Sequence, residues 1–237
     1  SDVCSSDLDA VADVAISASL PARLPDGITH CVLAVGDGMA ATVADALASI
    51  EEIPSGLIVF HTSGSLPASL LAPLATRGCV AGCLHPMQSF PLQALAPDRL
   101  EGIGCGVEGS DTFWSEASAL AHALGWKPLR IAAERKTLYH AANVFAGNFP
   151  VALAQAAEHL LRASAVDGTS ASLGHLLPML QTVVARLDDV APSEALTGPA
   201  ARGDRETIAR HLAALETIDP KLRAAYAALT ELLMADG

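Results

Sequence analysis

The chain has 237 residues, 51% of them hydrophobic, and a formal net charge of -12 from 26 acidic and 14 basic side chains. This length and apolar content allow a full core in one large or two ordinary domains. The negative charge repels phosphate backbones and acidic lipid headgroups, which argues against nucleic acid and membranes as partners. No apolar run approaches the roughly 18 residues of a spanning helix, and residues 1–9 do not resemble a signal peptide, so we expect a cytoplasmic protein.

The first half of the chain alternates short apolar runs with helical patterns. The expected strands are 31–35, 57–64, 79–86, 102–109 and 128–132, and the expected helices between them are 40–50, 67–76 and 112–124. Strands without polar alternation are covered on both faces. The first half is therefore predicted to be an α/β unit with a mostly parallel sheet.

From about residue 134 the strand patterns stop. The expected helices are near 134–163, 169–190, 192–196, 204–217 and 220–235. Pro150 and Pro178 each remove a backbone donor and favour a kink or a break, whereas Asp204 and the Asp219–Pro220 pair are typical helix starts. We therefore expect two domains, an α/β domain over 1–133 and an all-helical domain over 134–237.

The cysteines do not suggest a disulfide framework. They are odd in number and mostly lie in apolar runs, as reduced buried thiols do: Cys4, Cys31, Cys79, Cys83 and Cys105. Alternation along a strand would place Cys79, Cys83 and His85 on one face, but their spacing is not that of a usual zinc site. We expect no metal.

Polar residues and glycines follow three of the predicted strands, at Gly36–Asp37, at His61–Gly64 and at His85–Ser89. Ligands of parallel sheets bind beyond the carboxyl ends of the strands. The motif at 61–64 either holds a carboxylate or a cofactor ribose, or is a plain strand-to-helix turn capped by Ser63 or Ser65. The His85–Pro86 pair either aims the imidazole outward from the sheet or buries a structural histidine.

The stretch ERKTLYHAANVFAGN, residues 134–148, carries a polar stripe. At helical spacing Lys136, Tyr139, His140, Asn143 and Gly147 share one arc, opposite an apolar arc. The polar arc faces either water or a site that needs a proton donor and an amide. A solvated face would more usually carry Glu and Lys four residues apart.

The segment LTGPAARGD, residues 196–204, combines two glycines, a proline and Arg202 ahead of a helix. Backbone donors and a guanidinium form an anion site, although Arg202 can equally pair with Asp204 in a helix–helix turn. No nucleophile elbow with a Ser-His-Asp set, no GxxxxGK[ST] loop and no paired-carboxylate motif is visible. Hydrolase and kinase chemistry are therefore disfavoured.

The order HTSG, HPMQSF, K-x-x-Y-H-A-A and TGPAARGD resembles one family. It is that of the Rossmann-like oxidoreductases with a C-terminal helical domain of unknown function, number 2520. These resemble pyrroline-5-carboxylate reductase, ketopantoate reductase and F420-dependent NADP reductase. The resemblance runs from about residue 31 to the end, and implies a helical domain similar to the C-terminal domains of 6-phosphogluconate dehydrogenases.

The resemblance also implies an NADP or NAD cofactor, a small-molecule substrate and a homodimer. Its cofactor-binding residues would be Val35, Gly36, Asp37 and Thr62. Its substrate-binding residues would be His61, Ser63, His85, Asn143, Asn148 and Arg202. Its catalytic residues would be Lys136 and His140.

The sequence departs from the family pattern at its start. A dinucleotide-binding fold begins with a strand and a G-x-G-x-x-G helix start. Residues 1–30 contain a single glycine, Gly27, and therefore no such motif. The opening SDVCSSDLD looks foreign to the pattern. We therefore expect an N-terminally incomplete Rossmann-like sheet and a weakened affinity for the cofactor.

Two interpretations follow. The leading hypothesis is an NAD(P)H-dependent oxidoreductase that acts on a small anionic C=O or C=N substrate, with Lys136 or His140 as proton donor, Asn143 orienting the substrate and Arg202 on its anionic end. The alternative is a non-catalytic module of the same fold that binds a small ligand or dimerises. The enzyme hypothesis requires Lys136, His140, His61 and His85 to converge.

Overall fold

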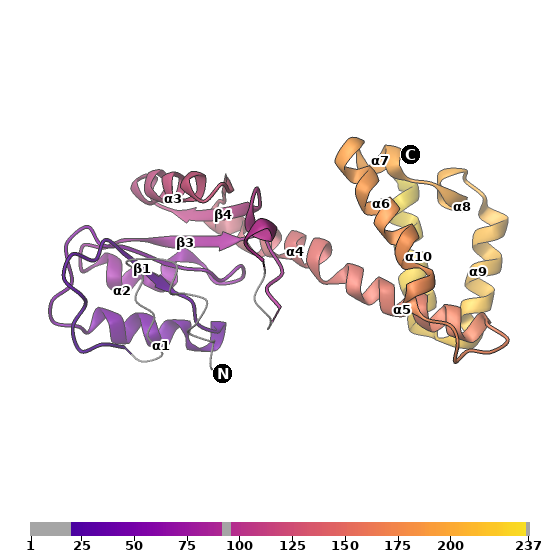
Figure 1. The fold of residues 1–237 in the computed structure, drawn as a ribbon, viewed down its shortest axis with the longest axis horizontal. Coiled ribbons are helices and arrows are strands. Elements are labelled where there is room, and N and C mark those ends of the chain that lie inside the picture. The colour runs from indigo at the N-terminus through magenta and orange to yellow at the C-terminus, as the bar shows by residue number, and fades with distance from the viewer. Residues whose placement is uncertain (1–19, 92–95, 236–237) are drawn as a thin grey trace. The chain divides into compact units, whose positions relative to one another are not determined.

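The computed structural model describes residues 20–91 and 96–235, and the chain divides into two compact units, residues 1–147 and 148–237 (Figure 1). Cys4 and the opening segment 1–9 lie outside the described residues. The division falls after Gly147, later in the chain than the boundary after residue 133 that the sequence suggests. The helix that begins at Lys136 is therefore grouped with the sheet.

The first unit contains a five-stranded sheet in which the strands follow one another in chain order. The strands are β1 (His30–Leu33), β2 (Ile58–His61), β3 (Val80–Pro86), β4 (Gly104–Gly109) and β5 (Lys127–Arg130). All neighbours are parallel except β3 and β4, which are antiparallel. The predicted mostly parallel α/β sheet is thereby confirmed.

Both faces of this sheet are covered, because β2 supplies side chains alternately to two cores. Val59 is fully buried in a cluster with Leu47 of α1 (Asp37–Ala48) and with residues of η2 (Ala68–Leu71) and α2 (Ala72–Ala75). Phe60 lies in a second cluster with Phe113 of α3 (Asp111–Ala123). This coverage is the physical reason why the strands lack polar alternation.

Shorter elements connect the strands and lead out of the sheet. The segment between β3 and β4 contains η3 (Pro97–Leu100), and β5 is followed by η4 (Ala133–Arg135) and α4 (Lys136–Gly147). The predicted helix over 134–163 is thus broken after Gly147, next to Pro150. A proline in the first turn of a helix loses no intrahelical hydrogen bond, which explains the position of the break.

The described residues of the second unit form helices joined by turns and include no strand, as the sequence predicts. Its elements are α5 (Phe149–Ser164), η5 (Leu173–His175), α6 (Leu177–Asp189), α7 (Pro192–Ala195), α8 (Gly198–Ala201), α9 (Arg205–Ile218) and α10 (Pro220–Ala235). Pro178 lies in the first turn of α6, so the expected helix over 169–190 begins later. Asp204 caps α9 by accepting a hydrogen bond from the Thr207 N–H, and α10 begins at Pro220.

None of the helices in ranges 20–91 and 96–235 combines the length and the apolar composition needed to span a bilayer.

The core on the α3 side of the sheet gives a stability test. Phe113 is fully buried, so Phe113→Ala should lower the free energy of unfolding by about 3 to 5 kcal/mol through lost transfer energy and a new cavity. The matched control is Phe90→Ala, because Phe90 is 57% exposed and its loss should change stability by only about 0.5 kcal/mol. Urea unfolding measures both values, and equal effects would contradict this description of the core.

Candidate functional site

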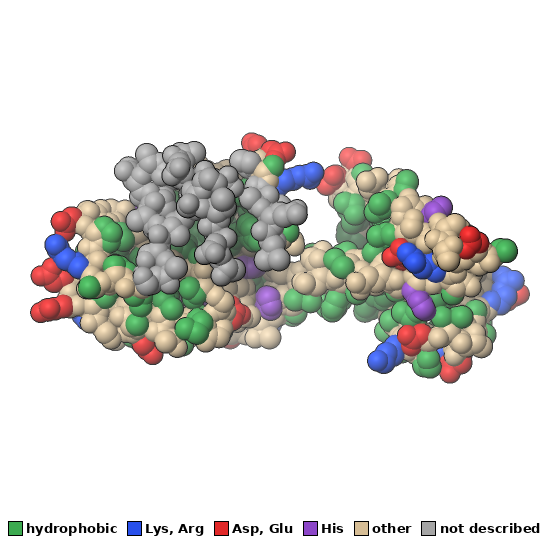
Figure 2. All heavy atoms as spheres, turned by 60° about the horizontal axis from the view of Figure 1, so that its bottom comes forward, with side chains coloured by type: hydrophobic (Ala, Val, Ile, Leu, Met, Phe, Trp, Pro, Cys, Tyr) green, Lys and Arg blue, Asp and Glu red, His purple; other side chains and the backbone are tan. Residues whose placement is uncertain are grey.

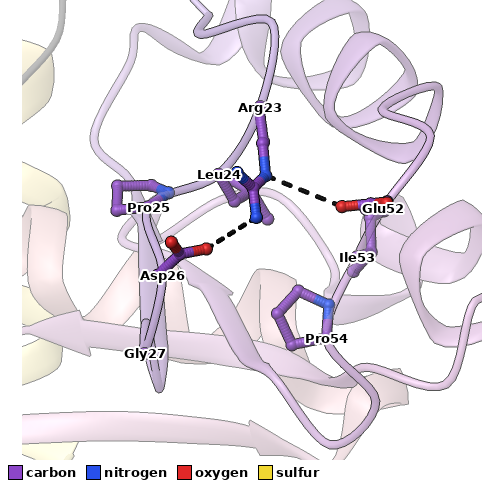
Figure 3. Close-up of a pocket in the computed structure, with 8 residues that line it drawn as sticks. All are labelled: Arg23, Leu24, Pro25, Asp26, Gly27, Glu52, Ile53 and Pro54. Carbon is purple, nitrogen blue, oxygen red and sulfur yellow. Dashed lines mark hydrogen bonds and ion pairs between the residues drawn. The ribbon is translucent and has the colours of Figure 1, made fainter.

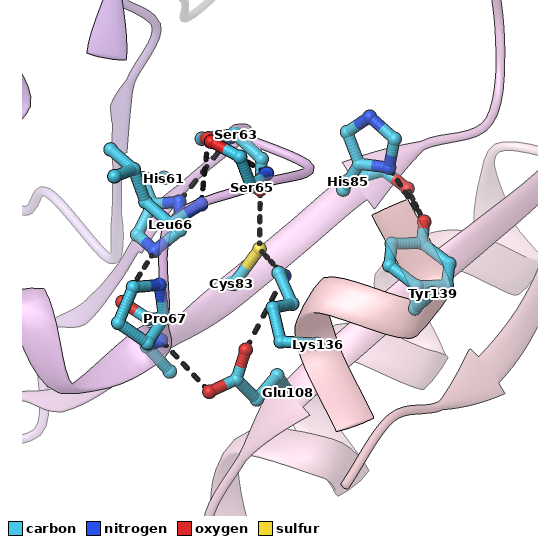
Figure 4. Close-up of polar contacts among 11 residues, drawn as sticks. His61, Ser63, Ser65, Leu66, Pro67, Cys83, His85, Glu108, Lys136 and Tyr139 are labelled. Atoms are coloured by element: carbon cyan, nitrogen blue, oxygen red, sulfur yellow. Dashed lines mark hydrogen bonds and ion pairs between the residues drawn. The ribbon is translucent and has the colours of Figure 1, made fainter. Parts of the chain in front are cut away.

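A buried ion pair joins α4 to the sheet. The Lys136 Nζ lies 3.3 Å from Glu108 Oε2 of β4, and both side chains are 4% exposed. The same Nζ donates to Cys83 Sγ of β3 at 3.0 Å, and Glu108 Oε1 accepts from the backbone N–H of Ala68 at 2.9 Å (Figure 4). The Lys136–Glu108 ion pair is therefore the point where four elements meet: β3, β4, η2 and α4.

Tyr139 of the α4 stripe also faces the sheet. Tyr139 is buried, and its hydroxyl lies 2.6 Å from His85 Nδ1 of β3 (Figure 4). Asn143 uses its amide Nδ2 to donate to the Tyr139 carbonyl at 2.9 Å. The opposite, apolar side of α4 is exposed, and Leu138 is 65% accessible. The stripe is thus packed at Lys136 and Tyr139 and partly buried at His140 and Asn143, so the interpretation of it as a wholly solvated face is wrong.

The imidazoles of His85 and His140 meet at the backbone of Gly64, just after β2. A Cβ added to Gly64 would stand 2.8 Å from His85 Nε2 and 2.8 Å from His140 Nδ1. Any side chain at position 64 would collide with both rings, so the close approach requires glycine. Among the described residues, the buried Nδ1 of His140 has no hydrogen-bond partner. An unpaired buried nitrogen is a candidate ligand contact.

The turn after β2 is held by its own hydroxyls. Ser63 Oγ accepts from the N–H groups of Ser65 and Leu66, and His61 Nδ1 accepts from the Ser63 N–H at 3.2 Å. This is the geometry of the plain capped turn. Ser65 Oγ in addition donates to Asp37 Oδ2 at 2.5 Å, which links the turn to the start of α1.

Burial sets the protonation of these groups. It lowers the pKa of His85 to about 4, with the Lys136 ammonium and His140 adding to the effect, and it lowers the pKa of His61. Burial also raises the pKa of Cys83 to about 11, although the neighbouring Lys136 opposes the shift. The hydrogen bond from Ser65 lowers the pKa of Asp37. At neutral pH His61 and His85 are thus neutral, the Cys83 thiol is protonated and Asp37 is ionised.

The structure brings most of the predicted site residues together within the first unit. His85 and His140 flank Gly64, and Lys136 and His61 are near enough to His85 to act on its charge. Ser63 accepts within the turn and donates its N–H to His61, and Asp37 is linked to the turn through Ser65. The other first-unit members are the half-buried Thr62 and Asn143 and the exposed Val35 and Gly36. Asn148 and Arg202 belong to the helical unit, where Asn148 precedes α5 and Arg202 ends α8.

Three residues of this cluster were not predicted from the sequence as site residues. Glu108 is the only charged residue in the apolar run 102–109, and that isolated charge was the available signal, because a buried carboxylate needs a partner. The sequence pattern suggests Cys83 only as a metal ligand, whereas its thiol lies against Lys136. The pattern places Tyr139 in the polar stripe but indicates no role for it. Within the described ranges, no three His, Cys, Asp or Glu side chains gather as metal ligands.

Two surface pockets have no histidine in their lining. One, of about 220 Å³, is lined by Arg23, Asp26 and Glu52, and the Arg23 guanidinium is paired with Asp26 at 2.7 Å and with Glu52 at 3.6 Å (Figure 3). The other, of about 350 Å³, borders Glu108 and residues 130–133. Neither contains a histidine, so we place the candidate site at Gly64, where the titratable groups converge.

Comparisons with known proteins identify the family. The model for a domain of unknown function, DUF2520, matches residues 103–233, and the model for a Rossmann-like domain matches residues 12–86. The chain belongs to the DUF2520 family. A comparison with the sequences of curated proteins gives no significant match.

Solved structures share the fold of this DUF2520 chain. Protein TM1727 from Thermotoga maritima is 26% identical, with a TM-score of 0.71, over 89% of this chain and 78% of that one. BF3122 from Bacteroides fragilis, described as a candidate NADP oxidoreductase, is 24% identical, with a TM-score of 0.64 and coverages of 87% and 75%. A reductive aminase from Aspergillus terreus, solved with NADPH, cyclohexanone and allyl amine, is 19% identical, with a TM-score of 0.52 and coverages of 88% and 74%.

Breaking the buried ion pair should lower the stability of the protein. Lys136→Met leaves the Glu108 carboxylate buried without a counter-charge, so we expect a loss of about 3 to 5 kcal/mol in the free energy of unfolding. The double variant Lys136→Met with Glu108→Gln removes both charges and should recover much of that loss. Lys127→Met, at an exposed lysine of β5, is the control. A single variant as stable as the control in denaturant unfolding would refute the pairing.

Proposed function

We propose that this chain is an NAD- or NADP-dependent oxidoreductase that acts on a small anionic substrate with a C=O or C=N group. The meeting of His85 and His140 at Gly64, just after β2, with Lys136 and His61 near enough to act on His85, carries the proposal. In sheets of this kind, ligands bind at that edge. The NADP- and NADPH-linked descriptions of BF3122 and of the reductive aminase, which share the fold, support the same class of chemistry.

The start of α1 suits a nicotinamide cofactor. A Cβ added to Gly36 or Gly38 would meet nothing within 4 Å, so the backbone there is open to a ligand. The Asp37 carboxylate already accepts a hydrogen bond from one hydroxyl, that of Ser65, and ribose hydroxyls are donors of the same kind. We assign Val35, Gly36, Asp37 and Thr62 to this contact. The cofactor, when bound, would supply or accept the hydride.

The groups around Gly64 would handle the proton and the substrate. His140 has an unpaired buried nitrogen that suits proton transfer to the substrate oxygen or nitrogen. The Lys136 ammonium is held by Glu108 and Cys83, so it would act through its positive charge or after leaving that pair. Asn143 would orient the substrate. Asn148 and Arg202 remain substrate-binding residues proposed from the family resemblance, with Arg202 for the anionic end.

A kinetic experiment tests the reductase function. The full chain is screened with NADPH and NADH against small keto acids and cyclic imines, and His140→Ala should lower kcat by about a hundredfold to ten-thousandfold. The matched control is His122→Ala, because His122 is exposed in the last turn of α3. Equal losses in the two variants would remove His140 from the mechanism.

The same screen separates the alternative function. A non-catalytic ligand-binding module would bind a nicotinamide cofactor or a keto acid in calorimetry without turning over any pair. An absence of both binding and turnover would overturn the proposed function altogether.

We further propose that the helical unit forms a homodimer. Its helices expose many large apolar side chains, part of which are visible in Figure 2: Val151, Leu153, Leu177, Met179, Val183, Val184, Leu187, Ile218, Leu229, Leu232 and Leu233. Exposed apolar surface of this extent is typical of an interaction site. A second copy is the expected partner, because most soluble oligomers are symmetric homo-oligomers.

Light scattering after size exclusion tests the dimer. Val183→Asp places a charge in the apolar stripe of α6, where Val183 is 49% exposed, and should shift the molar mass from dimer to monomer. Ala185→Asp adds the same charge on the other side of α6 and should leave the mass unchanged. A monomeric parent chain would refute the dimer without affecting the test of reductase activity.

A further inference from the structure

We propose that Tyr139 is a positioning residue that fixes His85 as the Nε2–H tautomer, which makes His85 a hydrogen-bond donor to the substrate oxygen or nitrogen. The inference rests on the proposed reductase function for its second half only. Its first half, the tautomer of His85, follows from the contacts of the side chains and can be tested without a substrate.

The Tyr139 hydroxyl has one short contact. Its oxygen lies 2.6 Å from His85 Nδ1 and 3.4 Å from the His85 carbonyl oxygen. The two rings are perpendicular, with centroids 5.6 Å apart. A buried hydroxyl must place its proton on an acceptor, and the nearer acceptor here is the ring nitrogen. The hydroxyl therefore donates to Nδ1.

The Tyr139 side chain has little room to move its hydroxyl away from His85 Nδ1. The backbone of Gly106 in β4 lies so close to the Tyr139 oxygen that a Cβ at that position would collide with it. Burial raises the pKa of Tyr139 to about 12, so the hydroxyl keeps its proton at neutral pH. The Asn143 side chain next to it and the backbone of Gly106 oppose that rise but do not reverse it. Tyr139 thus remains a donor.

The consequence appears at the other nitrogen of His85. In a neutral imidazole one nitrogen accepts and the other carries the proton, so an accepting Nδ1 leaves the proton on Nε2. That Nε2 faces Gly64, at the same point as the unpaired Nδ1 of His140. A neutral imidazole that donates from Nε2 can polarise a carbonyl or an imine without bringing a charge into the site.

The charged and titratable groups around His85 agree with a neutral ring. Lys136 of α4 and His140 of the same helix disfavour a second proton, as does His61 of β2, whereas Asp37 of α1 favours one. Burial is the largest single cause of the lowered pKa of His85. His85 therefore enters the reaction as a neutral donor.

Nuclear magnetic resonance of the full chain with ¹⁵N-labelled histidine tests the tautomer directly. Long-range proton–nitrogen correlations should show His85 with a protonated Nε2 and an unprotonated Nδ1, and His85→Gln identifies its signals. Tyr139→Phe should replace this single pattern by a mixture of tautomers. A parent protein with the proton on Nδ1, or an unchanged pattern in Tyr139→Phe, would overturn the inference. If Tyr139→Phe does not fold, the spectrum of the parent alone decides.

The chain offers a matched control in a second histidine–tyrosine pair. In the helical unit, His211 Nδ1 lies 2.7 Å from the Tyr226 hydroxyl, again with the rings nearly perpendicular. Tyr226→Phe should change only the His211 signals. With an active pair of substrate and cofactor, Tyr139→Phe should lower kcat by about tenfold or more with little change in KM for the cofactor, and Tyr226→Phe should alter neither.

The tautomer of His85 and its role as a donor to the substrate can be refuted separately. Absence of turnover in every form of the protein would overturn the reductase function and with it the donor role of His85, but leave the tautomer assignment standing. Normal kcat in Tyr139→Phe, together with a changed tautomer, would refute the donor role of His85 alone.

Discussion

The first unit depends on the burial of one charge pair. Lys136 and Glu108 are both withdrawn from solvent, and each is held by a further contact, with Cys83 and with the backbone N–H of Ala68. Removing two ions from water is costly, and the interior compensates for this only when the geometry supplies attraction and hydrogen bonds together. The pair therefore fixes where the first turn of α4 lies on the sheet, and through it the positions of Tyr139 and His140.

This placement explains why an unusual helix face is turned inward. Most helices on a sheet bury an apolar stripe, but α4 buries Lys136, Tyr139 and half of His140 and exposes Leu138. Lys136 finds its partners in Cys83 of β3 and Glu108 of β4, and Tyr139 finds its partner in His85 at the carboxyl end of β3. In a Rossmann-like sheet that edge is where ligands bind, and the same arrangement supports the proposed oxidoreductase chemistry. Membership of the DUF2520 family does not by itself give a reaction.

Much of the fold could be predicted from the sequence, because strands covered on both faces and helices with capping residues leave strong local signals. The five strands, the helices around them and the effects of Pro150 and Pro178 are of this kind. The antiparallel direction of β4 could not be predicted, because the hydrophobic pattern of an apolar strand does not depend on whether it runs parallel or antiparallel to its neighbour. The family resemblance inferred from four short motifs is also confirmed.

The site could be predicted only in part. The spacing of the α4 stripe placed Lys136, Tyr139 and His140 on one face, which the helix period alone determines. The pairing of Lys136 with Glu108 depends on which strand lies under that face, and a single sequence does not contain this information. The contact between the His85 ring and Tyr139 could likewise not be predicted, because the two residues are separated by 54 positions along the chain.

The alternation of β2 ties the site to the interior of the protein. Val59 and His61 project from one face of the strand, whereas Ile58 and Phe60 project from the other and fill the core under α3. A slip of this strand by one residue would exchange the two sets, sending an imidazole into the aromatic core and a phenyl ring to the ligand edge. The packing of the two hydrophobic layers therefore fixes the register of β2, and with it the position of the site residues. A strand in the wrong register would lose stability, so the fold does not present a misplaced site.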